Sequence, residues 1–290
     1  MNATGRHDVA FQGVAAAFAE EAALAFNGPL ARTLPCHRLE EVFDAVESGA
    51  ASYGAFPIEN SLAGPVLASY DLLAARPLRL VGEVVLRVSH ALIAPLGVKI
   101  EAIRRVFSHP VALAQCEDFF RQNPQIEAVA AYNTAGAVRD VIASGAPDAA
   151  AIASSRAADV HGGVVLQREL EDHPQNYTRF LLAARPDAAP PAGPWGAARK
   201  TSLIVTLAHR PGTLAATLNV FADRAIDLSK IESRPLRGRP FEYAFFIDLA
   251  GDAEDPALAD AVREVSARAA TVRLLGSYAA LPGSPSRPAD

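Results

Sequence analysis

The stretch GAFPIENSLAGPV, from Gly54 to Val66, places a run of polar residues directly behind an apolar strand. The letters AFPI are typical of a buried strand end. Asn60 or Ser61 alone would suffice to cap the helix expected near Pro65, with Glu59 simply exposed. Polar loops between strands and helices are common with or without a function. The stretch alone therefore leaves open whether these polar residues cap a helix or belong to a site.

The composition narrows the class of protein. The chain has 290 residues, 50% of them hydrophobic, and a net charge of −5. This length suggests about two domains, each large enough to bury a core. No basic tract is present, so no nucleic acid is expected as a partner. No apolar run has the length of a signal peptide or membrane helix, so we expect a cytoplasmic protein without a membrane partner. The lone Cys36 and Cys116 indicate a reducing compartment and no cysteine metal site.

The clearest break in the chain is ARPDAAPPAGPWGAARK, residues 184–200, which is typical of a linker. Before it, strand-like runs alternate with helical patterns, as in DVAFQ followed by AAAFAEEAALAF. This alternation predicts an α/β sheet with helices on its faces. Polar clusters follow four of the strands, and ligands of such sheets bind at the carboxyl ends of strands. These clusters are Gln12-Gly13, Glu59-Asn60-Ser61, Ser108-His109 and Ser154-Ser155. Their recurrence favours a functional interpretation of the opening stretch.

After the linker the order of elements changes to strand, helix, two strands, helix and strand. TSLIVTL starts the first strand at Thr201, and TVRLLGSY ends the last strand at Tyr278. This βαββαβ order predicts a ferredoxin-like unit. The final residues, LPGSPSRPAD, are typical of a disordered tail.

Three further motifs each have a structural explanation. In FSHPVALAQC, Ser108 or His109 can cap a helix that carries proline in its first turn, and the pattern extends this helix over 110–122. NYTRFLL is strand-like, and its structural explanation is an edge-strand threonine, Thr178, with a solvated Arg179. Alternatively, Arg179 could bind a carboxylate through two hydrogen bonds. In KIESRP, Glu232 and Arg234 could be exposed charges that form a weak pair. No GxGxxG, P-loop, HExxH or GxSxG motif occurs, which counts against nicotinamide cofactors, nucleotides and zinc.

Taken together, PIENS, SHPxALAQC, TRF and ESRP resemble the prephenate dehydratase family, in its order and spacing, from about Asp8 to about Tyr278. The resemblance implies an α/β fold with a two-lobed catalytic domain, similar to the type 2 periplasmic binding fold, and a C-terminal ferredoxin-like (βαββαβ) ACT domain. The expected catalytic domain spans 7–184, with lobe 1 at 7–81 and 176–184 and lobe 2 at 82–175. A linker at 185–200, the ACT domain at 201–280 and a tail at 281–290 complete the chain.

The resemblance also implies the reaction, in which prephenate loses carbon dioxide and water to give phenylpyruvate on the route to phenylalanine. Aromatisation drives it, so no cofactor or metal is expected. The residues that match catalytic positions of the family are Thr178, Glu59, Asn60, Ser108 and Gln115, and those expected to bind substrate are Ser61, Arg179 and Phe180. We expect Thr178 to hydrogen-bond the departing oxygen. Glu59 could be the acid only if burial raises its pKa.

The ACT domain of the family binds phenylalanine as a feedback inhibitor and pairs across a subunit interface. We therefore expect L-phenylalanine as effector and a homodimer or homotetramer. The expected effector-binding residues are Gly212, Thr213, Leu214, Asp227, Leu228, Glu232 and Ser233. Plant arogenate dehydratases share the motifs, so arogenate remains an alternative substrate. A non-catalytic protein that binds amino acids or anions is the alternative from another class.

One segment departs from the family pattern. After the first strand the family usually carries a glycine-rich turn and then a serine, roughly GxxGxxS. Here VAFQGVAAAFAEEAA keeps Gly13 but has Ala16 and Ala19 at the second glycine and serine positions. The loss of the hydroxyl leaves backbone N–H groups at the helix N-terminus to hold a carboxylate.

Overall fold

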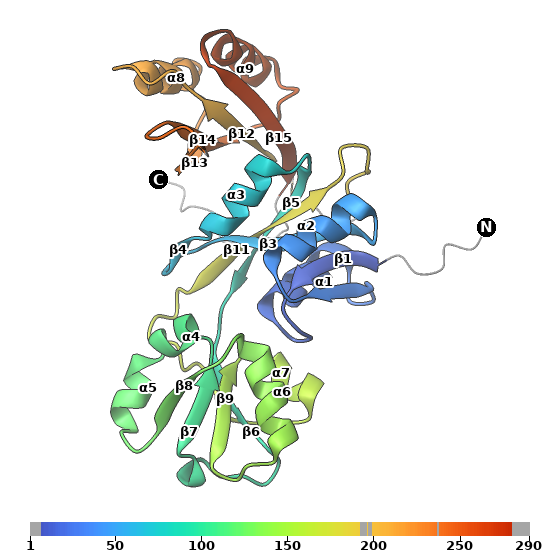
Figure 1. The fold of residues 1–290 in the computed structure, drawn as a ribbon, viewed down its shortest axis with the longest axis vertical. Helices are drawn as coiled ribbons and strands as arrows, with labels where there is room; N and C mark the ends of the chain where they lie inside the picture. Colours follow the sequence, from blue (N-terminus) through green and yellow to red (C-terminus); the bar gives the residue numbers. More distant parts are fainter. Residues whose placement is uncertain (1–6, 192–195, 197–198, 237, 280–290) are drawn as a thin grey trace, which may run out of the picture. The chain divides into compact units, whose positions relative to one another are not determined.

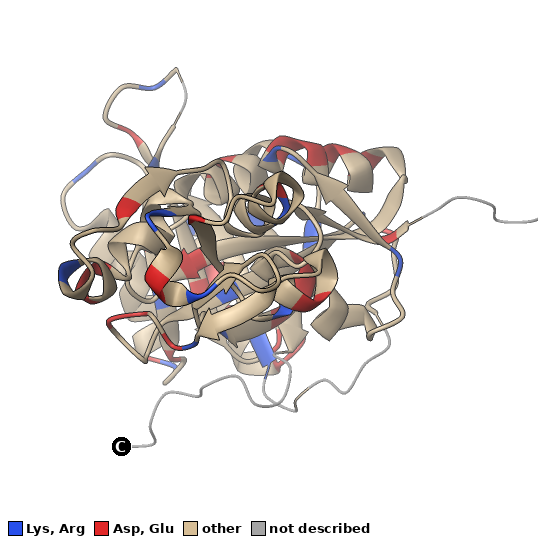
Figure 2. Cartoon of the chain, turned by 90° about the horizontal axis from the view of Figure 1, so that it is seen from below, with Lys and Arg blue, Asp and Glu red and all other residues tan. Residues whose placement is uncertain are grey.

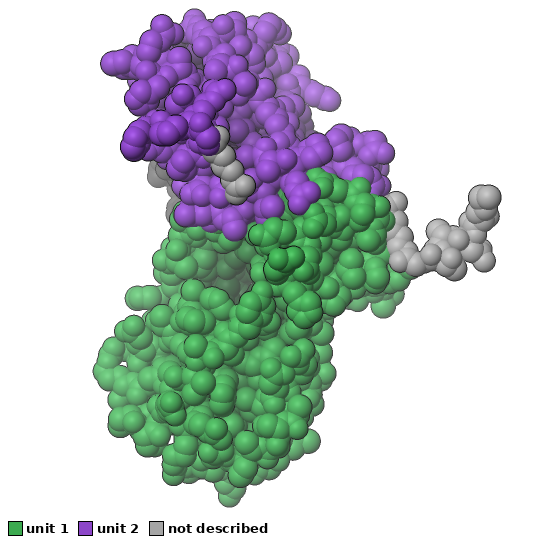
Figure 3. All heavy atoms as spheres, viewed as in Figure 1, with its two compact units in different colours: residues 1–66, 85–180 green, residues 67–84, 181–290 purple. Residues whose placement is uncertain are grey.

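A computed structural model describes residues 7–191, 196, 199–236 and 238–279, and it divides into two compact units (Figure 3). Unit 1 consists of residues 1–66 and 85–180, and unit 2 of residues 67–84 and 181–290. The expected tail at 281–290 and residues 192–195 and 197–198 of the expected linker lie outside the described residues.

The first sheet contains the opening stretch. Its strands are β1 (His7–Gln12), β2 (Thr33–Cys36), β3 (Ala51–Asn60), β4 (Gly64–Pro65), β5 (Arg79–Arg87) and β11 (Tyr177–Ala184). Their order is β2-β1-β3-β11-β5, and β4 pairs with β3. Helices α1 (Phe18–Asn27) and α2 (Leu39–Ser48) pack on parallel strands β1 and β3, as Figure 1 shows. The α/β architecture expected from the alternating pattern is present.

Helix α1 begins at Phe18, three residues after the start of its apolar pattern. The segment between β1 and α1 is a turn in which Gly13 has φ 121° and Ala16 has φ 69°. A left-handed conformation is uncommon for alanine and costs glycine nothing. The family's usual glycine at this position is therefore explained by the backbone, and Ala16 occupies it with some strain.

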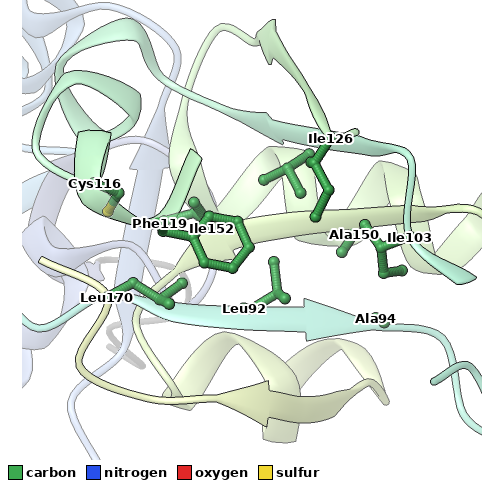
Figure 4. Packing of buried hydrophobic residues seen from close by; sticks show 10 residues of the cluster. Leu92, Ala94, Ile103, Cys116, Phe119, Ile126, Ala150, Ile152 and Leu170 are labelled. Atoms are coloured by element: carbon green, nitrogen blue, oxygen red, sulfur yellow. The ribbon is translucent and has the colours of Figure 1, made fainter. Parts of the chain in front are cut away.

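The second sheet lies wholly in unit 1. Its strands are β6 (Ala91–Ala94), β7 (Arg105–Ser108), β8 (Glu127–Ala130), β9 (Ala149–Ala153) and β10 (Val164–Gln167), in the order β10-β6-β9-β7-β8. The short 3₁₀ helix Ile100–Ala102 and helices α4 (Pro110–Ala114), α5 (Glu117–Gln122), α6 (Thr134–Ser144) and α7 (Arg156–His161) connect them. Figure 4 shows part of the core, where Phe119 of α5, Ile152 of β9 and Leu92 of β6 belong to one buried cluster.

The single helix expected over 110–122 is wrong, because the structure breaks it into α4 and α5. The carboxylate of Asp172 accepts hydrogen bonds from the backbone N–H groups of Glu117 (2.9 Å) and Asp118 (3.0 Å), and so caps α5. The Asp172 N–H in turn donates to the carbonyl of Gln115 at 2.8 Å. The break thus fixes the backbone of Gln115 at the end of α4.

Unit 2 contains the expected βαββαβ unit, formed by β12 (Arg199–Thr206), α8 (Thr213–Ala222), β13 (Leu228–Pro235), β14 (Tyr243–Ala250), α9 (Pro256–Arg268) and β15 (Thr271–Ala279). The antiparallel order is β13-β14-β12-β15. Both helices cover one face of this sheet (Figure 1), where Phe221 and Leu258 pack with Leu203 and Ile247.

Helix α3 (Leu67–Ala75) belongs to the same unit and is bound to it by two arginines. Arg234 does not pair with Glu232 as one interpretation of KIESRP suggested. Its Nε and Nη2 each lie 2.9 Å from a carboxylate oxygen of Asp71. Arg273 donates to the carbonyls of Leu73 and Leu78, both at 2.9 Å, and so satisfies backbone groups at the C-terminal end of α3.

Figure 2 shows Lys and Arg interspersed with Asp and Glu over the described part of the chain. Among the described residues, no helix combines the length and apolar character needed to cross a bilayer. The second sheet falls within the range expected for lobe 2, whereas the compact units divide the chain at 66/67, 84/85 and 180/181. The expected lobe boundaries stay a prediction.

Candidate active site

The polar residues of the opening stretch form a hairpin and do not cap a helix. Strand β3 continues through Asn60, which pairs with Gly64 of β4, and α3 begins only at Leu67. The Oδ1 atom of Asn60 accepts hydrogen bonds from the backbone N–H groups of Leu62 (2.9 Å) and Ala63 (2.8 Å). Asn60 therefore stabilises the tight turn between β3 and β4, as asparagine commonly does in turns.

The other end of the Asn60 amide reaches β11. Its Nδ2 atom lies 2.8 Å from Oδ1 of Asn176, 3.1 Å from the carbonyl of Tyr177 and 3.0 Å from Oγ1 of Thr178. The PIENS and TRF motifs, 118 positions apart, therefore meet through this one amide. Because Oγ1 of Thr178 accepts this bond, the hydroxyl keeps its own hydrogen to donate elsewhere.

The SHPxALAQC motif contributes Gln115 to the same group. Its Oε1 atom accepts a hydrogen bond from Nδ2 of Asn176 at 2.9 Å and lies 3.0 Å from Nε2 of His90. His109 is the N-cap of α4, and its Nδ1 accepts from the N–H of Val111 at 3.2 Å. The cap interpretation of Ser-His-Pro is thus confirmed for His109.

These residues surround a cavity of about 570 Å³ that lies entirely in unit 1. Of the residues expected from the sequence, Asn60, Gln115, Thr178 and Phe180 line it. Gln12 and Gly13 of the first polar cluster line it as well. Residues from three of the four polar clusters at strand ends therefore line one cavity: Gln12-Gly13, Asn60 and His109.

The cavity wall is apolar with a few hydrogen-bond donors. No Lys, Arg, Asp or Glu of the described residues lines it. The wall includes the starts of two long helices, at Phe18 and Ala19 of α1 and at Asn133 and Thr134 of α6. Helix N-termini carry unpaired N–H groups and a partial positive charge, so they can bind anions without a cationic side chain.

Four expected site residues lie away from this wall. Glu59 faces Arg179, with a carboxylate oxygen 3.7 Å from Nη1, and Arg179 is buried. The hydroxyl of Ser61 donates to the carbonyl of Gln175 and accepts from the N–H of Tyr177. Ser108 is fully buried, and its hydroxyl donates to the carbonyl of Ile152 at 2.6 Å. These four side chains therefore bind neighbouring side chains and backbone groups and do not line the cavity.

Sequence patterns did not point to His90, which lines the cavity and is 2% exposed. Burial lowers the pKa of its imidazole, which favours the neutral form. The only sequence signal was a histidine next to a buried strand, VSHALIAP, and such a residue is usually part of a core.

Glu20 is a second residue that the sequence patterns did not point to, and it holds the turn before α1. Glu20 of α1 accepts a hydrogen bond from the N–H of Ala16 (2.7 Å) and pairs with Arg156 of α7 (2.7 Å). Burial acts to raise the pKa of Glu20, but these two partners outweigh it, so the pKa lies below its ordinary value. Glu20 is only 7% exposed, whereas acidic residues on helical faces are usually solvated.

The two cysteines are free and buried. Burial raises the pKa of Cys36 to about 11 and that of Cys116 to about 12. Both side chains are therefore neutral thiols, and Cys116 belongs to the core of the second sheet.

The βαββαβ part of unit 2 has a cavity of its own, of about 740 Å³, at the start of α8. The expected effector residues Gly212, Thr213 and Leu214 line it, together with Tyr243 and Phe245 of β14. Gly212 is the N-cap of α8 and has φ 82°. The other expected effector residues, Asp227, Leu228, Glu232 and Ser233, are not on this wall and lie on or just before β13.

Comparison with known proteins gives consistent matches over nearly the whole chain. A family described as prephenate dehydratase matches residues 9–188, and the ACT domain family matches residues 201–267. "Arogenate dehydratase/prephenate dehydratase 2, chloroplastic" of Arabidopsis thaliana is 41% identical over 281 residues, which are 93% of this chain and 72% of that protein.

Two solved structures are also similar. A prephenate dehydratase of Arthrobacter aurescens in complex with L-Phe has a TM-score of 0.85 and 33% identity, over 97% of this chain and 93% of that one. A protein described as "GqqA- a novel type of quorum quenching acylases" has a TM-score of 0.85 and 34% identity, over 94% of this chain and 98% of that one.

Proposed function

We propose, since the chain belongs to the prephenate dehydratase family, that it converts prephenate to phenylpyruvate in the cavity of unit 1. One observation carries the proposal: the Thr178 hydroxyl and the Gln115 amide share an apolar cavity with two helix N-termini, and no charged side chain of the described residues lines it. Prephenate is a dianion with an apolar ring and one ring hydroxyl. Its two carboxylates match the starts of α1 and α6, and its ring matches the apolar wall.

The reaction needs little beyond orientation and one hydrogen bond. The bond between the ring and its carboxylate breaks, and its electron pair completes the aromatic ring as carbon dioxide leaves. The ring hydroxyl departs on the other side as hydroxide, which takes up a proton from solvent and is released as water. Thr178 donates a hydrogen bond to this oxygen, where negative charge develops, and keeps its proton; its own oxygen already accepts a hydrogen bond from Asn60. Such a donor typically contributes a factor of ~10²–10⁴ to the rate.

Arogenate has an amine where prephenate has a ketone and would fit the same wall. The test is purified protein with each substrate, with phenylpyruvate and phenylalanine measured as products. We expect conversion of prephenate. A higher kcat/KM for arogenate would instead identify arogenate as the preferred substrate. Tight binding of both without conversion would instead support a non-catalytic binding protein.

The structure does not favour acyl transfer, the activity for which the acylase among the structural relatives is named. The hydroxyl of Ser108 is buried and donates to a backbone carbonyl, so it cannot serve as a nucleophile. The hydroxyl of Thr178 accepts its bond from an amide, which cannot remove a proton.

For regulation, we propose that L-phenylalanine binds at the start of α8, with its carboxylate on the N–H groups near Gly212 and its ring toward Tyr243 and Phe245. Strand β13 is an edge of its sheet, with Ile231 43% exposed. An edge strand with an exposed apolar residue supports pairing of two copies. Asp227 to Ser233 would then lie at the subunit interface of a homodimer or homotetramer.

A point variant tests the effector site better than truncation after the linker. Removing the C-terminal domain would leave Asp71 of α3 without Arg234 and would remove Arg273 from the end of that helix. Loss of inhibition in the truncated protein could then result from damage to α3 and would not be specific to loss of the effector site. A cytoplasmic location stays a prediction from the sequence.

A further inference from the structure

His90 lies in the short connection between β5 and β6, and its backbone is fixed on both sides. Its N–H donates to a carboxylate oxygen of Glu171 at 2.8 Å, and its carbonyl accepts from the N–H of Leu170 at 3.0 Å. The ring of Phe18 meets the imidazole edge-on, with centroids 6.0 Å apart. The imidazole therefore has one defined position on the cavity wall.

The orientation of the amides in this network follows from the backbone. Oδ1 of Asn60 must be the acceptor end of its amide, because two backbone N–H groups, of Leu62 and Ala63, donate to it. Its Nδ2 is then the donor, and Oδ1 of Asn176 accepts from it. The opposite end of Asn176 is therefore Nδ2, which donates to Gln115.

The orientations of Gln115 and His90 follow in turn. The atom of Gln115 that accepts from Asn176 is the carbonyl oxygen Oε1, and a carbonyl oxygen has no hydrogen to give. Nε2 of His90, 3.0 Å from this oxygen, must therefore carry the hydrogen. His90 is the Nε2–H tautomer, and its buried Nδ1 has no hydrogen-bond partner among the described residues.

We propose that His90 is a positioning residue of the active site, which holds the Gln115 carboxamide so that its NH₂ group is presented to the substrate. This inference rests on the proposed dehydratase function of the cavity. Two donors, from His90 and Asn176, hold the oxygen of Gln115, and both hydrogens of its NH₂ group remain for a carboxylate or carbonyl of the substrate. Without His90 only one donor holds the amide, which can then rotate and present its oxygen to an anion instead.

The first experiment is a double-mutant cycle in which kcat/KM with prephenate is measured. His90→Leu removes the donor and keeps an apolar side chain, and we expect a loss of about tenfold, the scale of one hydrogen bond. His90→Gln offers an NH₂ donor near the position of Nε2 and should stay within about threefold of the wild type. In a Gln115→Met background, His90→Leu should cost less than about twofold, because the partner on which it acts is gone.

An equal loss in both backgrounds would overturn the proposal, since His90 would then act on stability or on another group. Equal activity of His90→Leu and the wild type would overturn it as well. Wild-type protein that converts neither prephenate nor arogenate would count against the proposed function, separately from the His90 network.

The second experiment needs neither activity nor a folded His90→Leu variant. Long-range ¹H–¹⁵N spectra of wild-type protein labelled at histidine report which ring nitrogen carries the hydrogen. We expect the Nε2–H tautomer for His90, with the signal identified as the one absent from His90→Gln. An Nδ1–H tautomer would reverse the hydrogen bond to Gln115 and refute the proposal, even where His90→Leu fails to fold.

Discussion

Replacing Thr178 by valine is the most direct test of the chemistry. Valine keeps the branched shape and the strand propensity but removes the hydroxyl. The network should survive, because Nδ2 of Asn60 retains two acceptors, Oδ1 of Asn176 (2.8 Å) and the carbonyl of Tyr177 (3.1 Å). The change therefore removes one donor from the cavity and little else.

The expected size of the effect follows from where that donor points. In the ground state the hydroxyl contacts a neutral ring hydroxyl, and such a bond contributes about 1 kcal/mol. In the transition state the same oxygen is leaving with negative charge in an apolar cavity, where removal of one donor typically costs ~10²–10³ in kcat, about 2.7–4 kcal/mol. We therefore expect kcat to fall by ~10²–10³ and KM to change by less than about fivefold.

The assay is the steady-state rate of phenylpyruvate formation, with thermal unfolding measured in parallel. Thr178→Ser is the matched control, because it keeps the hydroxyl and should retain most of kcat. If Thr178→Val retains kcat within about threefold while Tm is unchanged, the hydroxyl does not assist the departing oxygen. A large rise in KM with an unchanged kcat would assign Thr178 to binding alone.

Three other changes test other parts of the structure. Ala16→Gly should raise Tm slightly and stabilise the fold by up to about 1 kcal/mol, because it relieves the left-handed backbone at φ 69°. Ala22→Gly, inside helix α1, should lower Tm and serves as control. The pKa of Glu20 is lowered in the folded state, so the stabilisation from its carboxylate is present above its unfolded pKa of about 4.5 and is lost as pH falls through the folded pKa. Glu20→Gln should therefore make Tm fall less steeply below about pH 5. An unchanged slope of Tm against pH would contradict this. Gly212→Val, at φ 82° on the effector wall, should weaken L-phenylalanine binding by at least tenfold in calorimetry, an effect of roughly 1.4 kcal/mol or more, with kcat retained.

The sequence was sufficient for the architecture because the relevant signals are local. Alternating strand and helix patterns predicted an α/β sheet and the βαββαβ unit, whereas two lobes were implied only by the family resemblance. The polar clusters marked the carboxyl ends of β1 and β3 in the first sheet and of β7 and β9 in the second. Local signals also produced the errors. The continuous apolar pattern of 110–122 predicted one helix, since the cap that divides it comes from Asp172, 55 positions from Glu117. No local signal marks Glu20 as buried, because its partner Arg156 is 136 positions away.

His90 illustrates why the remaining part of the site could not be predicted. Its role depends on the direction of hydrogen bonds that begin at the backbone of the β3–β4 turn and pass through Asn60, Asn176 and Gln115. No spacing in the chain encodes this sequence of contacts, because it joins four segments that only the fold brings together.

The absence of charged side chains among the described residues of the cavity wall could not be predicted from the sequence either. If its affinity for an anion comes from the backbone N–H groups of α1 and α6, no lysine or arginine is needed on the wall, and the composition of the site leaves no ionic signature in the sequence. Ala19→Ser at the start of α1 should therefore lower KM for prephenate by at most a few-fold, since the added hydroxyl only supplements donors that the helix already provides.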